Sequence, residues 1–243
     1  MSILGSRIRW QRRAVRAHLL QGMPLLLAAA MVRAQAGGSA PTPVSAADLC
    51  ITEGSLTRGA DGRLTVATPK MRAFARIAIA DAAETQFTYL GPSAIDSPLA
   101  SGVLRRQFGL KLRAADACNL VYVMWRFAPE SKLVVQTKIN PGQHASSECG
   151  NRGYQTVRPR HTTPLPALSA DAAHVLRAQL LGRQLQVTVD GHSVWQGDLA
   201  SADLAPGPVG VRSDNAKVAF RLAAGPGPTL SGALPACRAD GAD

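Results

Sequence analysis

The sequence is short of acidic side chains, and of glutamate above all. It carries 27 Lys and Arg residues against 16 Asp and Glu residues, and the only glutamates are Glu53, Glu84, Glu130 and Glu148. Retaining glycosidases need two carboxylates about 5 Å apart across the scissile bond. None of the four glutamates lies in a Glu-x-Asp-x-x-Glu strand pattern. The sequence therefore argues against hydrolysis by paired acids.

Several other catalytic motifs are also missing. There is no Gly-x-Ser-x-Gly turn for a nucleophilic serine and no glycine-rich loop that could cradle a phosphate. No two cysteines have the close spacing that zinc sites use. No internal repeat is present, and residues 37–243 show no long 3.6-residue periodicity. Serine hydrolases, nucleotide-binding folds, zinc fingers and helical bundles are not indicated.

Long apolar runs are absent too. The longest apolar stretch is short and lies in a basic N-terminus. The stretch Pro24–Val32 is too short to span a bilayer and sits among six arginines between Arg7 and Arg33, with no acid. Ala34-Gln-Ala36 provides small residues for a signal peptidase, so residues 1–36 are predicted to be a secretory signal cleaved after Ala36. Arg12-Arg13 fits a twin-arginine signal poorly, so the general secretory route is favoured over the twin-arginine route. A cleaved signal is likewise favoured over an amphipathic helix that stays as a membrane anchor.

Cleavage changes the charge and sets the domain limits. Losing six arginines lowers the formal net charge from +11 to +5, which makes nucleic-acid binding a weak interpretation. Residues 37–47 are expected to form a flexible leader, and residues 48–240 one β-sandwich domain of a secreted or periplasmic protein. The sequence predicts neither an oligomeric state nor a transmembrane segment after cleavage.

Short period-2 segments separated by Gly, Pro, Asn and Asp predict an all-β protein. Asp190-Gly191 is a strong signal for a two-residue hairpin. Residues 141–170 are expected to form a long loop. The predicted strands are Leu64–Ala67, Ala73–Ala80, Thr85–Leu90, Gln107–Arg113, Leu120–Phe127, Leu133–Ile139, Val175–Leu181, Leu185–Val189, Ser193–Trp195, Val209–Arg212 and Val218–Leu222.

The four cysteines all follow the signal, and an even number in an oxidising compartment predicts two disulfides. Three pairings are open. Cys118–Cys149 and Cys50–Cys237 are favoured. The first would tie a strand to the loop after the next strand, and the second would join the two ends of the domain.

Three consecutive strands, from Gln107 to Asn140, alternate apolar residues with basic and amide residues. Alternate side chains of a strand point to opposite faces, so the polar set is expected to share one sheet face. Trp125 has the parity of the core set, whereas Tyr122 has the parity of the polar set and is a candidate for stacking on a sugar ring. The predicted ligand-binding residues are Gln107, Lys111, Arg113, Tyr122, Arg126, Gln136, Lys138 and Asn140.

The stretch Val175–Gly197, followed by Gly207–Asn215 and Val218–Leu222, resembles the last hairpins of concanavalin A-like (laminin-G-like) jelly rolls in strand order. The resemblance implies a two-sheet antiparallel sandwich with a concave face, a shape that cradles glycan chains in many relatives. Together with the basic residues it predicts binding of an extended acidic glycan.

Two alternatives to glycan binding stay open. Alginate-lyase-type jelly rolls are similar in their polar strands, which implies Tyr122, Gln136, Lys138 and His144 as catalytic groups of a polyuronate lyase. In this sequence the triplet Gln136-Thr-Lys138 lacks the histidine of those enzymes. The other alternative is a structural or adhesion module of the cell envelope. No cofactor is predicted. A structural calcium at Asp214-Asn215 is an option, although a turn is favoured there.

Overall fold

The structure is a computed structural model that describes residues 40–169, 171–200 and 204–226 and Cys237. The chain divides into two units, residues 1–37 and 38–243, and every described residue belongs to the second unit. The predicted signal, residues 1–36, and the leader up to residue 39 lie outside the described residues. Within the described part, no helix is long and apolar enough to cross a membrane.

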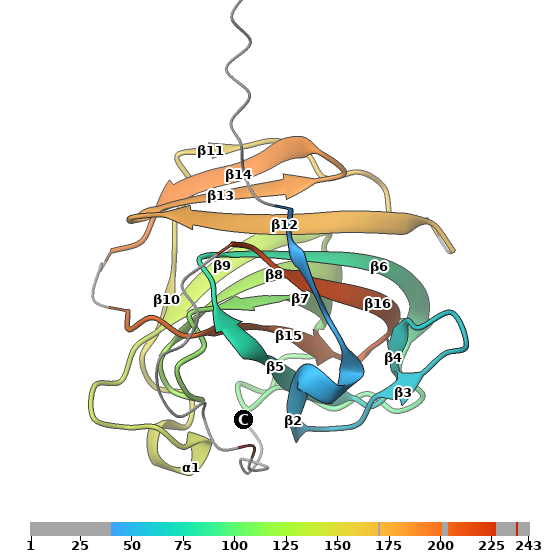
Figure 1. Ribbon diagram of the computed structural model, residues 1–243, viewed down its shortest axis with the longest axis horizontal. Helices are drawn as coiled ribbons and strands as arrows, with labels where there is room; N and C mark the ends of the chain where they lie inside the picture. The colour runs from blue at the N-terminus through green and yellow to red at the C-terminus, as the bar shows by residue number, and fades with distance from the viewer. Residues whose placement is uncertain (1–39, 170, 201–203, 227–236, 238–243) are drawn as a thin grey trace, which may run out of the picture. The chain divides into compact units, whose positions relative to one another are not determined.

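The described unit consists of two antiparallel sheets that pack on each other (Figure 1). Two short helices, η1 (Ala46–Asp48) and α1 (Ser146–Cys149), lie in connections. The first sheet has the order β11 (His161–Thr162), β14 (His192–Asp198), β13 (Gln184–Val189), β12 (Ala173–Leu181), β6 (Ala82–Pro92), β16 (Ala216–Ala224), β4 (Leu64–Val66) and β3 (Thr57–Arg58), with β1 (Thr42–Val44) paired to β16. The second sheet has the order β10 (Tyr154–Thr156), β9 (Lys132–Lys138), β8 (Leu120–Ala128), β7 (Arg106–Leu112), β15 (Pro208–Asp214), β5 (Lys70–Ile79) and β2 (Leu49–Glu53).

This architecture confirms the predicted all-β sandwich, and each of the eleven predicted strands is present within a few residues. The sequence analysis missed the short strands β1, β2, β3, β10 and β11. Four of these five have two or three residues, and so short a strand shows little alternation. The expected long loop after β9 in fact holds α1, β10 and β11.

The core lies between the two sheets and contains most of the aromatic side chains. Trp125 is fully buried, which confirms the prediction that it belongs to the core, and Trp195 is buried as well. The ring of Phe87 lies 5.6 Å from that of Trp125 and 5.3 Å from that of Phe108, so the first sheet contacts the second through aromatic rings. Such ring pairs stabilise the fold by more than the burial of their apolar surface alone.

Two tight connections show why particular turn residues occur. Asp190 and Gly191 both have positive φ, 51° and 81°, which is the backbone of a two-residue hairpin between β13 and β14. Asn215, with φ 52°, is the single residue between β15 of the second sheet and β16 of the first. Asparagine tolerates this left-handed conformation better than most residues do. The predicted hairpin and the predicted turn are both confirmed.

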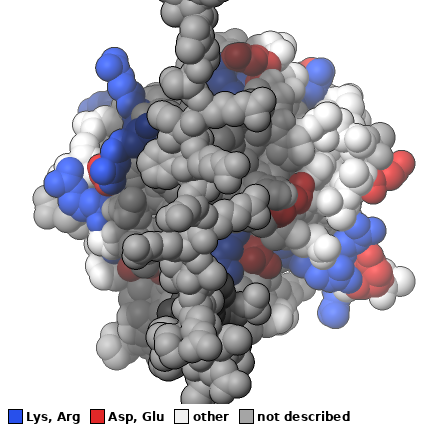
Figure 2. Space-filling view, turned by 90° about the horizontal axis from the view of Figure 1, so that it is seen from above, with Lys and Arg blue, Asp and Glu red and all other residues white. Residues whose placement is uncertain are grey.

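Exposed charges on the described surface occur largely as pairs of opposite sign. Arg63 binds Asp61 at 2.6 Å, and Arg160 binds Asp198 at 2.5 Å. Basic and acidic side chains lie close together at several places on the face that Figure 2 shows. Exposed pairs of this kind add little to stability.

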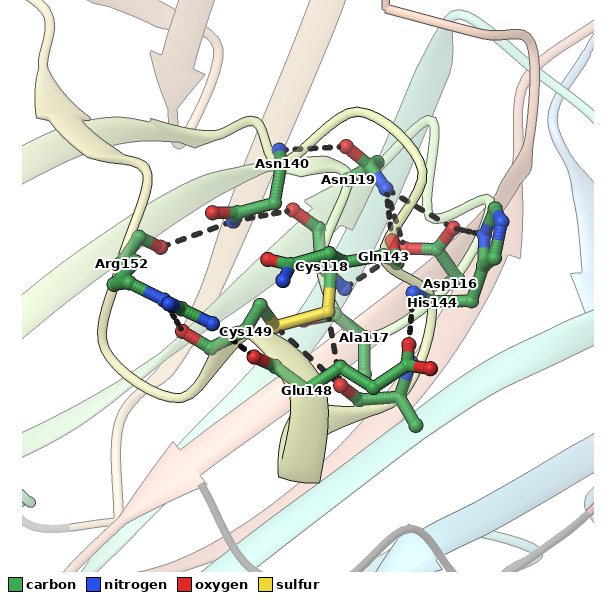
Figure 3. The surroundings of a disulfide bond; sticks show 11 residues. Asp116, Ala117, Cys118, Asn119, Asn140, Gln143, His144, Glu148, Cys149 and Arg152 are labelled. Carbon is green, nitrogen blue, oxygen red and sulfur yellow. Dashed lines mark hydrogen bonds and ion pairs between the residues drawn. A yellow bond between two sulfur atoms is a disulfide. The ribbon is translucent and has the colours of Figure 1, made fainter.

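Both predicted disulfides are present. Cys118 and Cys149 join the residues just before β8 to α1, and Cys50 of β2 pairs with Cys237 (Figure 3 shows the first). Around the first disulfide, the carbonyl oxygens of Cys118 and Arg152 accept hydrogen bonds from the Asn140 side chain. The disulfide and the amide together hold the connection from β9 to β10 against the start of β8.

Candidate functional site

Six of the eight predicted ligand-binding residues lie on the outer face of the second sheet. Phe108, Val123 and Val135 point from β7, β8 and β9 into the core, so their alternates point outward. The strand register places Gln107 opposite Arg126 and Tyr122 opposite both Lys111 and Gln136. We call this surface the polar face, and its predicted members are Gln107, Lys111, Tyr122, Arg126, Gln136 and Lys138.

The other two predicted residues lie elsewhere. Arg113 follows the end of β7 with φ 49°, so the strand alternation does not extend to it. Its guanidinium group donates to both carboxylate oxygens of Asp81, at 2.7 and 3.1 Å, in the connection between β5 and β6. Asn140 lies beyond the end of β9 and is occupied by the hydrogen bonds around the disulfide described above. Both side chains therefore hold connections in place.

A buried ionic network forms the floor of the polar face. The Asp214 carboxylate on β15 is fully buried and accepts hydrogen bonds from Arg72 at 2.7 Å, from Arg212 at 2.9 Å and from Gln107 at 2.6 Å. Arg72 comes from β5, Gln107 from β7 and Arg212 from β15. One carboxylate thus holds together donors from three adjacent strands.

Charge pairing sets the ionisation of this network. Burial by itself would raise the pKa of Asp214, but the positive charges of Arg212 and Arg72 outweigh burial and hold that pKa well below its ordinary value. Burial would likewise lower the pKa of Arg212, and the Asp214 carboxylate raises it instead. Asp214 and Arg212 are therefore both ionised at neutral pH.

This network also bears on the calcium alternative. The oxygens of Asp214 accept from three protein donors, and Oδ1 of Asn215 accepts from the Ser97 backbone N–H at 2.7 Å. In addition, no group of three or more His, Cys, Asp or Glu side chains is gathered as metal ligands within the described ranges. Asp214 and Asn215 thus act in the β15–β16 connection and the network beneath the polar face.

Tyr154 of β10 covers part of the polar face. It lies opposite Lys138 in the strand register, and its ring stacks at 6.0 Å from the ring of Tyr122. The Lys138 ammonium group lies 5.0 Å from the centre of the Tyr154 ring, and the Arg212 guanidinium lies 4.9 Å from that of Tyr122. Tyr122 and Lys138 are buried as a result, while Tyr154 is half-buried. Tyr154 is therefore the aromatic ring that a ligand can reach.

A cavity of about 220 Å³ lies over the polar face beside Tyr154. The connection between β6 and β7 provides one wall through Leu99–Ser101, and Met124 lies among the lining residues. No carboxylate is among the residues that line the cavity. Besides Ser101, its polar lining consists of Arg105, Gln107, Gln136, Asn151, Tyr154 and Arg212.

Asn215 holds the wall provided by the β6–β7 connection. Its side-chain N–H₂ group donates to the carbonyl oxygens of Ser97 and Arg105, at 2.8 and 3.0 Å. Its backbone carbonyl accepts from the N–H of Ser93 at 3.2 Å. One buried side chain thus fixes both ends of the connection whose tip lines the cavity.

Besides Ser101, four polar lining residues are not among the predicted ligand-binding residues: Arg105, Asn151, Tyr154 and Arg212. Arg105 precedes the predicted strand Gln107–Arg113, Asn151 and Tyr154 lie in the expected loop of residues 141–170, and Arg212 ends the predicted strand Val209–Arg212. None of them belongs to the three strands from which the ligand-binding residues were predicted. Arg212 alternates with the core residues Val209 and Val211 in the same way as the predicted residues do. Applying the alternation rule to β15 would have found it.

Three of the four residues proposed for lyase chemistry, Tyr122, Gln136 and Lys138, are neighbours on the polar face, and His144 lies apart from them. Gln136 lines the cavity, whereas Tyr122 and Lys138 are buried beneath Tyr154. His144 is exposed near the disulfide, where its Nδ1 lies 2.8 Å from a carboxylate oxygen of Asp116 (Figure 3). The hydrogen bond to Asp116 raises the pKa of His144. His144 is not among the residues that line the cavity.

Comparison with known proteins supports the fold. No protein-family model matches the sequence, and no curated protein matches it. The carbohydrate binding module CBM66 from Bacillus subtilis superposes with a TM-score of 0.50 at 12% identity, covering 71% of this chain and 91% of that one. A protein of unknown function with a galectin-like fold, also from Bacillus subtilis, gives 0.48 at 12% identity, covering 73% and 88%. This chain has the concanavalin A-like jelly-roll fold. A fold by itself does not determine an activity.

Proposed function

We propose that the protein binds an acidic carbohydrate in the cavity over the polar face. The observation that carries the proposal is the lining itself, which combines two arginines, three side-chain amides and a tyrosine with no carboxylate. Guanidinium groups bind carboxylate or sulfate in a bidentate manner, and amides pair with hydroxyl groups. A similar fold in a carbohydrate binding module is consistent with this use of the sandwich.

Each part of the lining has a defined role in this proposal. The ring of Tyr154 stacks on a sugar, and Gln136 and Asn151 bind its hydroxyl groups. Arg105 binds the acidic group, because the guanidinium of Arg212 is already engaged by Asp214 at 2.9 Å. The buried network keeps Gln107 and Arg212 in place, so the site is organised before a ligand arrives.

We also infer that the protein acts outside the reducing cytoplasm. Two disulfides among the described residues are typical of exported proteins. The N-terminal sequence has the three parts of a secretory signal. Both features agree with a ligand found in a cell envelope or an extracellular matrix.

A glycan array that contains neutral, carboxylated and sulfated oligosaccharides tests the proposal. Acidic glycans are expected to bind, and their binding is expected to weaken as salt rises, because the contacts are ionic. Arg105→Gln is expected to weaken binding about tenfold, which corresponds to about 1.4 kcal/mol. Arg58→Gln, which removes the same charge from exposed strand β3, serves as the matched control and should bind like the wild type. Equal binding of neutral and acidic glycans, or none at all, would refute the proposal.

A further inference from the structure

Three arginines gather at the end of the polar face where β7 begins. Arg105 lines the cavity described above and also a neighbouring cavity of about 260 Å³, which Arg106, its ion-pair partner Asp96 and Pro129 line as well. Arg126 lies on β8 opposite Gln107, close enough for the charge of Arg105 to act on it. We call Arg105, Arg106 and Arg126 the arginine cluster.

The positive charge of this cluster is only partly balanced. Arg106 binds Asp96 at 2.9 Å, and Glu130, the acid nearest in sequence to Arg126, binds Lys132 at 2.5 Å. Across the part of the chain that the structure describes, the side chains of Arg105 and Arg126 take part in no ion pair or hydrogen bond. Burial lowers the pKa of Arg126, and the charge of Arg105 lowers it further, with Glu130 partly opposing both.

Each arginine of the cluster also has one donor, its Nε–H, without an acceptor among the described residues. The Nε atoms of Arg105, Arg106 and Arg126 are all buried, and none has a hydrogen-bond partner among the described residues. Buried N–H groups without an acceptor are rare in proteins and costly. An oxyanion bound side-on by a guanidinium accepts from Nε–H and from one Nη–H together. The unmet requirement of this cluster is therefore an anion with at least two oxygens.

The backbone holds this arrangement in position. The carbonyl oxygen of Arg105 accepts a hydrogen bond at 3.0 Å from the buried side chain of Asn215. The pairing of β7 with β8 shifts by one residue between Arg106 and Gln107, which is a β-bulge. Bulges change the direction of side chains and are common beside binding sites.

We propose that the arginine cluster is a second anion site, which binds a carboxylate or sulfate group on the sugar unit next to the one in the cavity. Arg105 lies between the two cavities and contacts both, so acidic groups on consecutive units can bind on either side of it. The ligand class is therefore an oligosaccharide that carries an acidic group on each of two neighbouring units. The link to a neighbouring sugar rests on the proposed function.

Chain length tests the link to a second sugar. Galacturonic acid and its dimer are titrated calorimetrically into the disulfide-bonded protein at low salt, beside sulfated galactan units of the same lengths. The protein is expected to prefer one acid type, carboxylate or sulfate. Within that series the dimer is expected to bind about tenfold tighter than the monomer. Arg126→Gln is expected to remove this gain and leave the affinity for the monomer within about twofold. Arg58→Gln is expected to change neither affinity. A gain from monomer to dimer that is equal in the wild type and in Arg126→Gln overturns the proposal.

Inorganic sulfate tests the anion site without any sugar. The Nε–H resonances of Arg105 and Arg126 are followed by nuclear magnetic resonance, with Arg126→Gln used to assign its own signal. Both resonances are expected to shift together and to saturate as sulfate is added. Shifts that do not saturate overturn the site even where a glycan binds. Saturable sulfate binding by a protein that binds no glycan supports the site and refutes the proposed function alone.

Discussion

Replacing Asp214 by asparagine tests whether the buried network is the structural basis of the polar face. The substitution keeps the size of the side chain but removes a charge that faces Arg72 and Arg212, at 2.7 and 2.9 Å. Both guanidinium groups are nearly buried. Arg212 would lose the carboxylate that it binds, and Arg72 would lose the closer of two, since it also lies 3.8 Å from Glu53. Breaking a buried ion pair in this way costs about 3–5 kcal/mol.

That cost is a large part of the stability expected for a domain of this kind, about 5–15 kcal/mol. Urea unfolding, followed through the fluorescence of buried Trp125, measures it as a change in midpoint at constant slope. Asp198→Asn is the matched control, because it makes the same substitution in an exposed pair with Arg160. The control is expected to cost less than about 1 kcal/mol. A loss for Asp214→Asn no larger than for the control would refute the account of the network.

The pH dependence gives a second check on Asp214. Its folded-state pKa is below its ordinary value, because the charges of Arg212 and Arg72 outweigh the effect of burial. The carboxylate therefore stabilises the fold at pH values above the unfolded pKa of about 3.9, and this contribution falls as the pH drops toward the folded pKa. The gap in stability between the wild type and Asp214→Asn should begin to narrow below about pH 4. A gap that stays constant down to strongly acidic pH would contradict this account.

Two further predictions concern the connection held by the disulfide. The double substitution Cys118→Ser and Cys149→Ser opens a loop with a sequence separation of 31 and should cost about 3–4 kcal/mol in urea unfolding; a loss below about 1 kcal/mol would contradict the entropic account of that cross-link. The pKa of His144 should lie above 6.5 and should fall in Asp116→Asn, because Asp116 accepts a hydrogen bond from the imidazolium. This pair stabilises the fold below the unfolded pKa of the histidine, and the contribution is lost as the pH rises through the folded pKa. A nuclear magnetic resonance titration measures both values, and a His144 pKa unchanged by Asp116→Asn would rule out the pairing.

The sequence alone determined which face of the second sheet most polar residues occupy. Alternation along a strand is a local property with a period of two, so Gln107, Tyr122 and Gln136 could be assigned to one face and Trp125 to the other without any tertiary information. The same rule failed at Arg113 and Asn140, because both lie beyond the last residue of a strand, where backbone geometry no longer follows that period. The cysteine pairing favoured from the sequence is also present in the structure. It was favoured because one pair would tie a strand to the loop after the next strand and the other would join the two ends of the domain.

Only the tertiary structure decided which of these polar residues a ligand can reach. Tyr154 covers Tyr122 and also Lys138, which lies sixteen positions before it in the chain. The carboxylate that binds Arg72 belongs to Asp214, which lies 142 residues after Arg72. Burial depends on such long-range contacts, which leave no periodic signal in the sequence. Arg105 entered the candidate site for the same reason, since the wall fixed by Asn215 places it at the cavity.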